Sequence, residues 1–154
     1  MGLMLDTSAV IGWVELQSEE LVQWLLDAAG DTVPAIHAAT LGELGRGVLE
    51  APDETTRTRR RATLRFGAEE LTVVPLSATS EQAHLFGVVS AAVSRKVSHN
   101  DCWITAAALD ADDTVVTMDE RLADQLRAAV EGDGHLADWL AERERTLDVK
   151  YCSR

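Results

Sequence analysis

The stretch Leu3-Met4-Leu5-Asp6-Thr7-Ser8 decides how the remaining chain is organised. Three apolar residues followed at once by polar ones are typical of a strand buried on both faces, as in a parallel sheet covered by helices. Asp6 then stands at the carboxyl end of this strand, where ligand crevices of open α/β sheets form. Thr7 and Ser8 open a helix. The same pattern also fits simple helix capping, because Asp and Ser are favoured at helix starts.

Strand and helix patterns alternate along the whole chain. Further strands are predicted at 32–34, 72–76, 114–117 and 146–149. Helices are predicted at 9–16, 19–29, 37–49, about 53–66, about 79–97, from 98 onward, 119–130 and around 136–140. Because right-handed crossovers join such units, we expect a central parallel sheet of four or five strands with helices on both faces. Residues 1–154 are predicted to form one domain, with a core at about 1–130 and a terminal helix and short strand at about 131–150.

Composition narrows the class of protein. The 154 residues are 46% hydrophobic, which excludes disorder for most of the chain, and no apolar stretch approaches the roughly 20 residues of a membrane span. The net charge of −12 argues against general nucleic-acid binding through a basic footprint. No signal peptide is recognisable, and Cys102 and Cys152 match no metal spacing. We therefore expect free thiols and a cytoplasmic protein without a membrane partner.

Four acids are expected to meet at one edge of this sheet. Asp6 and Asp119 each follow a buried strand, and helices that begin or pass there can add Asp101 and Glu43. Two unit charges about 4 Å apart repel by about 4 kcal/mol at an effective dielectric of about 20. A divalent cation offsets such repulsion, and clustered carboxylates suit Mg²⁺ or Mn²⁺. The chemistry that follows is hydrolysis of a phosphodiester.

Glu43, a group of glycines and a basic run each allow more than one structural interpretation. Glu43 also fits a solvated helix position, the usual fate of glutamate. Three glycines in one predicted helix, Gly42, Gly45 and Gly47, indicate close approach to another element or a ligand. The basic run Arg57–Arg65 is either a solvated face or a contact surface for phosphates or an acidic partner.

Four stretches together carry a family resemblance. They are Leu5-Asp6-Thr7-Ser8-Ala9, Glu43-Leu44-Gly45-Arg46-Gly47, Asn100-Asp101-Cys102-Trp103-Ile104-Thr105-Ala106-Ala107-Ala108 and Thr117-Met118-Asp119. In order, spacing and total length they resemble the PIN-domain ribonucleases, in particular the VapC-type toxins of toxin–antitoxin pairs. The similarity covers roughly residues 1–125, and its strength lies in the order of the four motifs.

The resemblance implies a three-layer PIN-like fold and a Mg²⁺- or Mn²⁺-dependent endoribonuclease. The implied acidic site consists of Asp6, Glu43, Asp101 and Asp119. Of these, Asp6 and Asp101 are the implied direct metal ligands. Three hydroxyl residues are implied to orient carboxylates or water: Thr7, Ser8 and Thr117. The resemblance further implies an RNA substrate, a homodimer, and a small antitoxin that places a segment in the groove near the site.

Two departures accompany this resemblance. Many relatives carry Asn at the position of Asp119 and an acid further on, where this chain has Leu122, and Asp124 is predicted to be a solvated helix residue. The segment after Gly132 is longer than in compact relatives and receives no predicted role. Two alternatives stay open: a PIN nuclease of RNA processing outside any toxin pair, and a non-catalytic interaction module whose acids are helix caps.

Overall fold

The computed structural model describes residues 1–77 and 79–153. Over these residues one sheet has the strand order β3-β2-β1-β4-β5, and every neighbouring pair is parallel. The strands are β1 (Leu3–Leu5), β2 (Ala35–His37), β3 (Thr72–Val74), β4 (Thr114–Thr117) and β5 (Val149–Tyr151). The helices are α1 (Thr7–Val14), α2 (Glu19–Ala29), α3 (Ala38–Leu49), α4 (Glu54–Glu70), α5 (Ser80–Ala92), α6 (His99–Ala111), α7 (Glu120–Glu131) and α8 (His135–Glu142).

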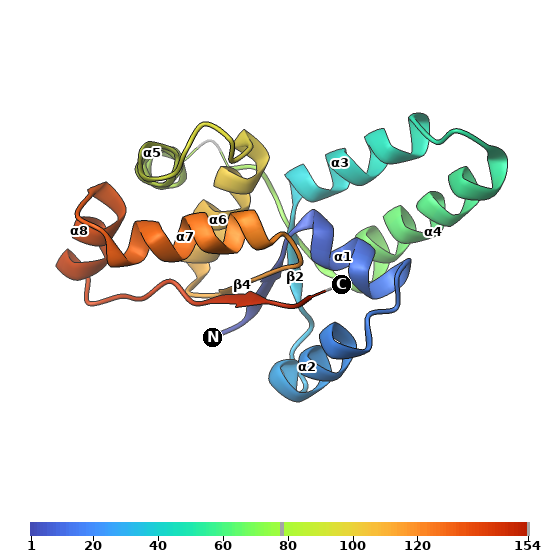
Figure 1. The fold of residues 1–154 in the computed structure, drawn as a ribbon, viewed down its shortest axis with the longest axis horizontal. Coiled ribbons are helices and arrows are strands. Elements are labelled where there is room, and N and C mark those ends of the chain that lie inside the picture. The colour runs from blue at the N-terminus through green and yellow to red at the C-terminus, as the bar shows by residue number, and fades with distance from the viewer. Residues whose placement is uncertain (78, 154) are drawn as a thin grey trace.

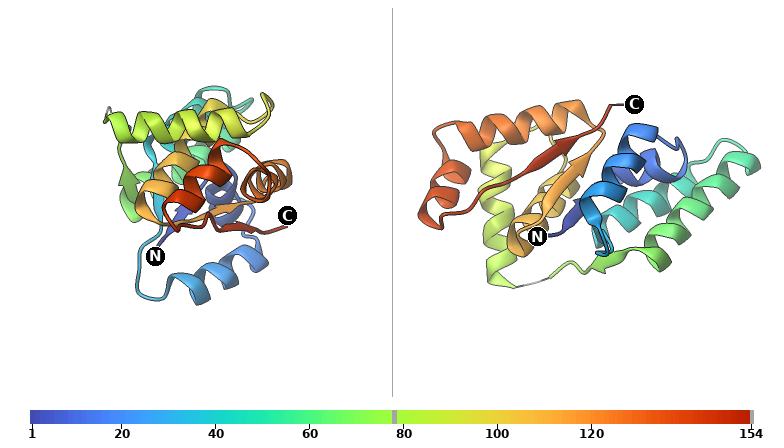
Figure 2. Two further views of the ribbon diagram at one scale, coloured as in Figure 1. Left: turned by 90° about the vertical axis from the view of Figure 1, so that its left-hand side faces the viewer. Right: turned by 90° about the horizontal axis from the view of Figure 1, so that it is seen from below.

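Helices cover both faces of this sheet, as predicted. Helices α5 to α8 lie on one side and α1 to α4 on the other, which Figures 1 and 2 show from three directions. Successive residues of a strand point to opposite faces. Met4 and Val115 accordingly pack into the core formed with α5 to α8, whereas Leu5 and Val116 pack into the core formed with α1 to α4. The predicted three-layer α/β architecture is confirmed.

The two strands with continuous apolar runs occupy the middle of the sheet. All of β1 is buried, as are Val115, Val116 and Thr117 of β4. The strands pair directly, with Leu5 opposite Val116. The expected neighbourhood of the first and fourth strands is therefore found, and their carboxyl ends lie side by side.

Two of the predicted strands were misplaced by about three residues. The second strand begins after Pro34, not before it, because Pro34 lacks the N–H of a ladder residue and only its carbonyl accepts, from Thr72 N at 3.0 Å. The closing strand was predicted at 146–149 but covers Val149–Tyr151. Leu147 is buried in the core before that strand begins, which gave the earlier segment its apolar signal.

Helix ends depart from prediction where capping decides them. The first helix was expected at 9–16 but covers Thr7–Val14, since Asp6 accepts from the backbone N–H of Ala9 and so begins the helix earlier. The fourth helix extends to Glu70 instead of 66, and the fifth ends at Ala92 instead of about 97.

The glycines of α3 do not mark a close approach within this chain. A Cβ at Gly42 or Gly45 would meet no atom within 4 Å, and one at Gly47 would meet only Arg60 Cδ at 3.9 Å. Close approaches lie instead at Gly12 of α1, where a Cβ would overlap with Met118 Sδ, and at Gly67 of α4, where it would lie 3.3 Å from Ile36 Cδ1. Among the described helices, none combines the length and apolar character needed to cross a membrane.

Candidate active site

The carboxyl ends of β1 and β4 bring Asp6 and Thr117 together. Leu5 lies opposite Val116, so the residues that follow leave the sheet next to each other. The backbone N–H of Asp6 continues the ladder by donating to the Val116 carbonyl at 3.0 Å. The hydroxyl of Thr117 donates to Asp6 Oδ2. The strand order thus creates this contact.

Asp6 is a helix cap that is also nearly inaccessible, with 1% of its surface exposed. Its Oδ1 accepts from Ala9 N at 2.8 Å and from Ser8 Oγ at 2.8 Å. Burial raises the pKa of Asp6 to about 6, against the lowering effect of the Thr117, Ala9 and Ser8 donors, and the charge of Asp101 raises it further. Capping does not require this burial, so capping alone does not account for the position of Asp6.

Two hydroxyls connect the turn after β1 with the turn after β4. Ser8 Oγ donates to the Asp6 carboxylate, accepts from Met118 N at 2.9 Å, and lies 3.2 Å from Thr117 Oγ1. Thr117 Oγ1 accepts in turn from Asp119 N at 2.9 Å. The orientation of the Asp6 carboxylate is therefore fixed by side chains that are themselves held by backbone groups.

Glu43 projects from α3 and is half-buried rather than solvated. The hydroxyl of Thr7 donates to its Oε2, and Asn100 Nδ2 donates to its Oε1 at 2.7 Å. Both oxygens are therefore engaged by segments from either side. Asn100 was not among the predicted site residues, although an amide donor directly before Asp101 in the sequence is a signal that could have identified it.

Asp101 lies in the first turn of α6 and is half-buried. Ser98 Oγ donates to Asp101 Oδ2 at 2.7 Å and accepts from Asp101 N at 3.1 Å. Burial raises the pKa of Asp101, and the neighbouring charges of Glu43 and Asp119 raise it further. Ser98 is a second contact that the sequence reasoning treated only as a helix start.

Asp119 is the cap of α7, and its side chain is 37% exposed. Its Oδ1 accepts from Leu122 N at 3.1 Å, and Arg121 Nη2 lies 3.9 Å from its Oδ2. Asp124, one turn further, is exposed as predicted. Asp119 therefore caps α7. It lies beside the other acids because it follows directly after the carboxyl end of β4.

All four predicted acids line one cavity of about 270 Å³. Its lining residues are Asp6, Thr7, Ser8, Ile11, Leu16, Glu43, Asp101 and Asp119. They come from four separate parts of the chain, namely the segment from Asp6 through α1 to Leu16, then α3, α6 and the turn before α7. The convergence expected from the sequence is present, and the predicted hydroxyls of Thr7 and Ser8 lie in the same lining.

The chemistry of this lining fits a hard divalent cation. Its potential ligands are carboxylate and hydroxyl oxygens, which Mg²⁺ and Mn²⁺ prefer. Arg121, at 3.9 Å from Asp119, is the one basic side chain in an ion pair with the four acids among the described residues. No three Asp, Glu, His or Cys side chains of the described chain already form a ligand set. Mg²⁺ commonly takes one or two carboxylates and keeps several waters, so no larger set is required.

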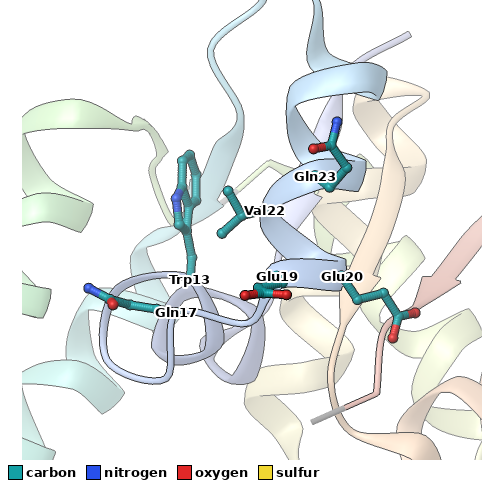
Figure 3. Close-up of a pocket in the computed structure, with 6 residues that line it drawn as sticks. All are labelled: Trp13, Gln17, Glu19, Glu20, Val22 and Gln23. Atoms are coloured by element: carbon teal, nitrogen blue, oxygen red, sulfur yellow. The ribbon is translucent and has the colours of Figure 1, made fainter.

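A larger hollow of about 780 Å³ lies where α1 passes into α2, and Figure 3 shows its lining. Trp13 lines this hollow together with Val22 and the acid Glu19. Trp13 also lines an adjoining hollow of about 340 Å³ that includes Leu26. This surface is largely apolar with scattered acids, so it differs in chemistry from the acidic cavity.

Comparison with known proteins gives both a family and a fold. A comparison with curated sequences finds no match to this chain. The VapBC2 complex of Rickettsia felis bound to a promoter DNA fragment has a TM-score of 0.68 at 18% identity, covering 98% of each chain. VapBC-5 of Mycobacterium tuberculosis has a TM-score of 0.62 at 23% identity, covering 99% of this chain and 100% of that one. VapC20 of the same organism, a sarcin–ricin loop cleaving toxin, has a TM-score of 0.57 at 15% identity, covering 80% and 94%.

These structural likenesses fall below 25% identity and establish the fold. The family rests on a sequence match to the PIN domain over residues 3–127, a span that includes every acid of the cavity. Strand order, acidic cavity and sequence match agree, and the chain belongs to the PIN domain family.

Proposed function

We propose that this chain is a metal-dependent endoribonuclease that serves as the toxin of a toxin–antitoxin pair. The observation that carries the proposal is the buried carboxylate of Asp6, held in one cavity with three further acids from separate segments. Mutual repulsion makes it unfavourable for the fold to hold four carboxylates together, so their clustering favours a catalytic role. The description of VapC20 as a sarcin–ricin loop cleaving toxin supports RNA as the substrate class.

Asp6 and Asp101 are the residues that would hold Mg²⁺ or Mn²⁺. When bound, the ion supplies positive charge against the transition state of the phosphodiester and lowers the pKa of a coordinated water. Thr117 and Ser8 keep the Asp6 carboxylate in one orientation through their hydrogen bonds. Ser98 does the same for Asp101 at 2.7 Å.

Glu43 is positioned in the same way from two other elements. Thr7 and Asn100 donate to its two oxygens, which directs the carboxylate without a cationic partner. Glu43 thereby adds negative charge beside Asp101, as the raised pKa of Asp101 reflects. This arrangement strengthens binding of a divalent cation and orients water at the reacting phosphate.

The test is cleavage of single-stranded and structured RNA by purified protein in Mg²⁺ or Mn²⁺. Asp6→Asn and Asp101→Asn should each abolish cleavage, whereas the matched control Asp124→Asn, at an exposed position of α7, should retain it. Circular dichroism and thermal unfolding confirm that each variant is folded. Retained cleavage in both Asp6→Asn and Asp101→Asn would reject the nuclease proposal. Titration with Mn²⁺ separates a nuclease from an interaction module, which would bind no metal near neutral pH.

The two hollows lined by Trp13 form a surface that is suited to binding a protein partner. Leu26 and Val33 are 66% and 53% exposed beside it, and Leu16, 54% exposed, lies at the acidic cavity itself. A partner segment with apolar and basic side chains would match this surface and could reach from it to the acids. The VapBC structures with this fold are complexes with antitoxins, which makes an antitoxin the proposed partner.

The toxin assignment has its own test. Expression in bacteria should arrest growth, and a small protein encoded next to the toxin gene should relieve the arrest and co-purify with the chain. Trp13→Asp should weaken that complex while leaving cleavage intact. Arrest without a neighbouring antitoxin gene would favour the alternative of an RNA-processing PIN nuclease. The homodimer implied by the family resemblance stays a prediction for sedimentation measurements.

A further inference from the structure

The loop between α5 and α6 carries a small basic surface next to the acidic cavity. Arg95 and Lys96 are exposed, follow each other in this loop, and precede Asp101 by only a few residues. Among the described residues, they are the Arg and Lys side chains that have neither a carboxylate, a carbonyl nor an aromatic ring as partner. In a chain with a net charge of −12, two adjacent cations without partners are exceptional.

The longer basic run of α4 has a different character. Each of its five arginines is engaged within the chain. The pairs are Arg57 with Glu54 at 2.6 Å, Arg59 with Glu15 at 3.4 Å, Arg60 with the Gly47 carbonyl at 2.6 Å, Arg61 with Glu54 at 3.3 Å and Arg65 with Glu69 at 2.9 Å. Three carboxylates, those of Glu54, Glu15 and Glu69, offset part of the positive charge of these five arginines. Of the two readings of this run, the solvated face is therefore favoured.

A cavity of about 370 Å³ lies under the loop, and Arg95 lines it. Its polar lining is Ser90, Ser94, Arg95, Ser98, His99 and Cys102. No carboxylate is among the described residues of this lining. Hydroxyl groups and a guanidinium without a competing acid form a suitable environment for a phosphate.

This cavity is linked to the acidic site through Ser98. Ser98 lines it and at the same time donates to Asp101 Oδ2 at 2.7 Å. His99, which also lines this cavity, is exposed, with its ring 5.9 Å from that of Phe86, which in turn stacks on Trp103 at 4.3 Å. An exposed ring supported in this way offers a face on which a nucleobase can stack.

We propose that Arg95 and Lys96 each bind one phosphate of the RNA strand beside the phosphodiester that is cleaved, with a neighbouring base against His99. This rests on the proposed ribonuclease function, because it concerns the path of the substrate beside the same acids. A polyanion that approaches four carboxylates needs a cationic contact close by, and Arg95 and Lys96 supply it. Every other Arg and Lys side chain of the described chain already has an internal partner, which is a carboxylate, a carbonyl oxygen or an aromatic ring.

The experiment measures RNA affinity in the cleavage-deficient Asp6→Asn background. Binding of a fluorescent single-stranded RNA of about twelve nucleotides is followed by anisotropy over a series of NaCl concentrations. For single strands, each neutralised phosphate contributes about 0.7 to the slope of log K against log salt. R95Q/K96Q should therefore flatten the slope by about 1.4 and weaken binding roughly tenfold or more in low salt. Each single variant should lower the slope by about 0.7.

The control is R57Q/R61Q, which removes two arginine charges from α4, and it should keep the wild-type slope. An unchanged slope for R95Q/K96Q, or an equal change in R57Q/R61Q, would overturn the inference. So would a loss of antitoxin binding with unchanged RNA binding, since the loop would then be a protein contact. This readout does not depend on cleavage. Cleavage surviving in Asp6→Asn and Asp101→Asn would reject the nuclease function, whereas an unaltered salt slope alone would reject only the RNA path.

Discussion

Asp6 is expected to destabilise the folded protein at neutral pH, so replacing it with Asn should stabilise the fold when no metal is present. The pKa of this carboxyl group is about 6 in the folded chain against an ordinary value of 3.8, chiefly because burial disfavours its charged form. At 1.36 kcal/mol for each pKa unit, this difference corresponds to about 3 kcal/mol. The value is an upper bound for the substitution, because Asn must also fit the hydroxyls of Ser8 and Thr117.

The direction in which Asp6 changes stability with pH follows from proton binding. The folded state binds the Asp6 proton more tightly than the unfolded chain, so the free energy of unfolding falls as the pH rises from about 4 to about 6. Below about pH 4 the Asp6 carboxyl group is protonated in both the folded and the unfolded state, so its burial no longer lowers the free energy of unfolding. Asn carries no charge at any of these pH values and keeps an acceptor oxygen for Ala9 N, now 2.8 Å from Asp6 Oδ1. The variant should therefore gain up to about 3 kcal/mol near pH 7.5, or about 6–12 °C in Tm.

The assay is urea unfolding of wild type and Asp6→Asn in EDTA at several pH values. The stability difference should grow by about 1.4 kcal/mol per pH unit between pH 4 and 6 and then level off. Asp53→Asn is the matched control, because Asp53 caps α4 while exposed, and hydrogen bonds from Thr56 lower its pKa. That variant should be destabilised at neutral pH, and its deficit should shrink as the pH falls below about 4. A difference for Asp6→Asn that stays flat from pH 4 to 7.5, or that is negative near pH 7.5, would refute the reasoning.

Three further predictions concern the metal, a positioning hydroxyl and the glycines. Mn²⁺ at about a hundred times its dissociation constant should stabilise the wild type by about 2.7 kcal/mol and should stabilise Asp6→Asn far less. Equal shifts in Tm for the two proteins would contradict a metal site at Asp6. Thr117→Val, which removes a donor to Asp6, should lower metal affinity or cleavage about 10–100-fold, and calorimetric Mn²⁺ titration checks this apart from activity. Gly42→Ala should raise the free energy of unfolding by about 1 kcal/mol, whereas Gly67→Ala should not, because its Cβ would lie 3.3 Å from Ile36 Cδ1.

The sequence predicted the central strands and the edge they share because these segments have strong local signals. The runs Leu3–Leu5 and Thr114–Thr117 are buried and end in polar residues, and they pair in the middle of the sheet. The positions of Asp6 and Asp119 follow directly from those strand ends. Glu43 lacked such a signal, since it lies off the apolar stripe of its helix, and its partners Thr7 and Asn100 come from distant segments. Its contribution to the site was predicted from motif order rather than from local chemistry.

The edge strands were harder to place because their local signals are weak or misleading. The second strand begins after Pro34, and the exposed Thr32 and Val33 imitate a strand without joining the ladder. The closing strand is half-buried throughout, so no apolar run marks it, while buried Leu147 shifts the apparent strand toward its own position. Each error is about three residues long and leaves β1 and β4, whose ends position Asp6 and Asp119, unaffected, which explains why the predicted cavity was still found.

Charge shows the sharpest difference between what a sequence and a structure can establish. In the sequence, the arginines of 57–65 form the conspicuous basic feature, and Arg95 with Lys96 is an ordinary pair. In the structure, Glu54, Glu69 and Glu15 engage the conspicuous run, so its contribution to attracting a polyanion is reduced. The ordinary pair lies above a cavity whose described lining holds no acid and which adjoins Asp101 through Ser98. A polyanionic substrate responds to the field that is left after internal pairing, and that field depends on which side chains meet in space.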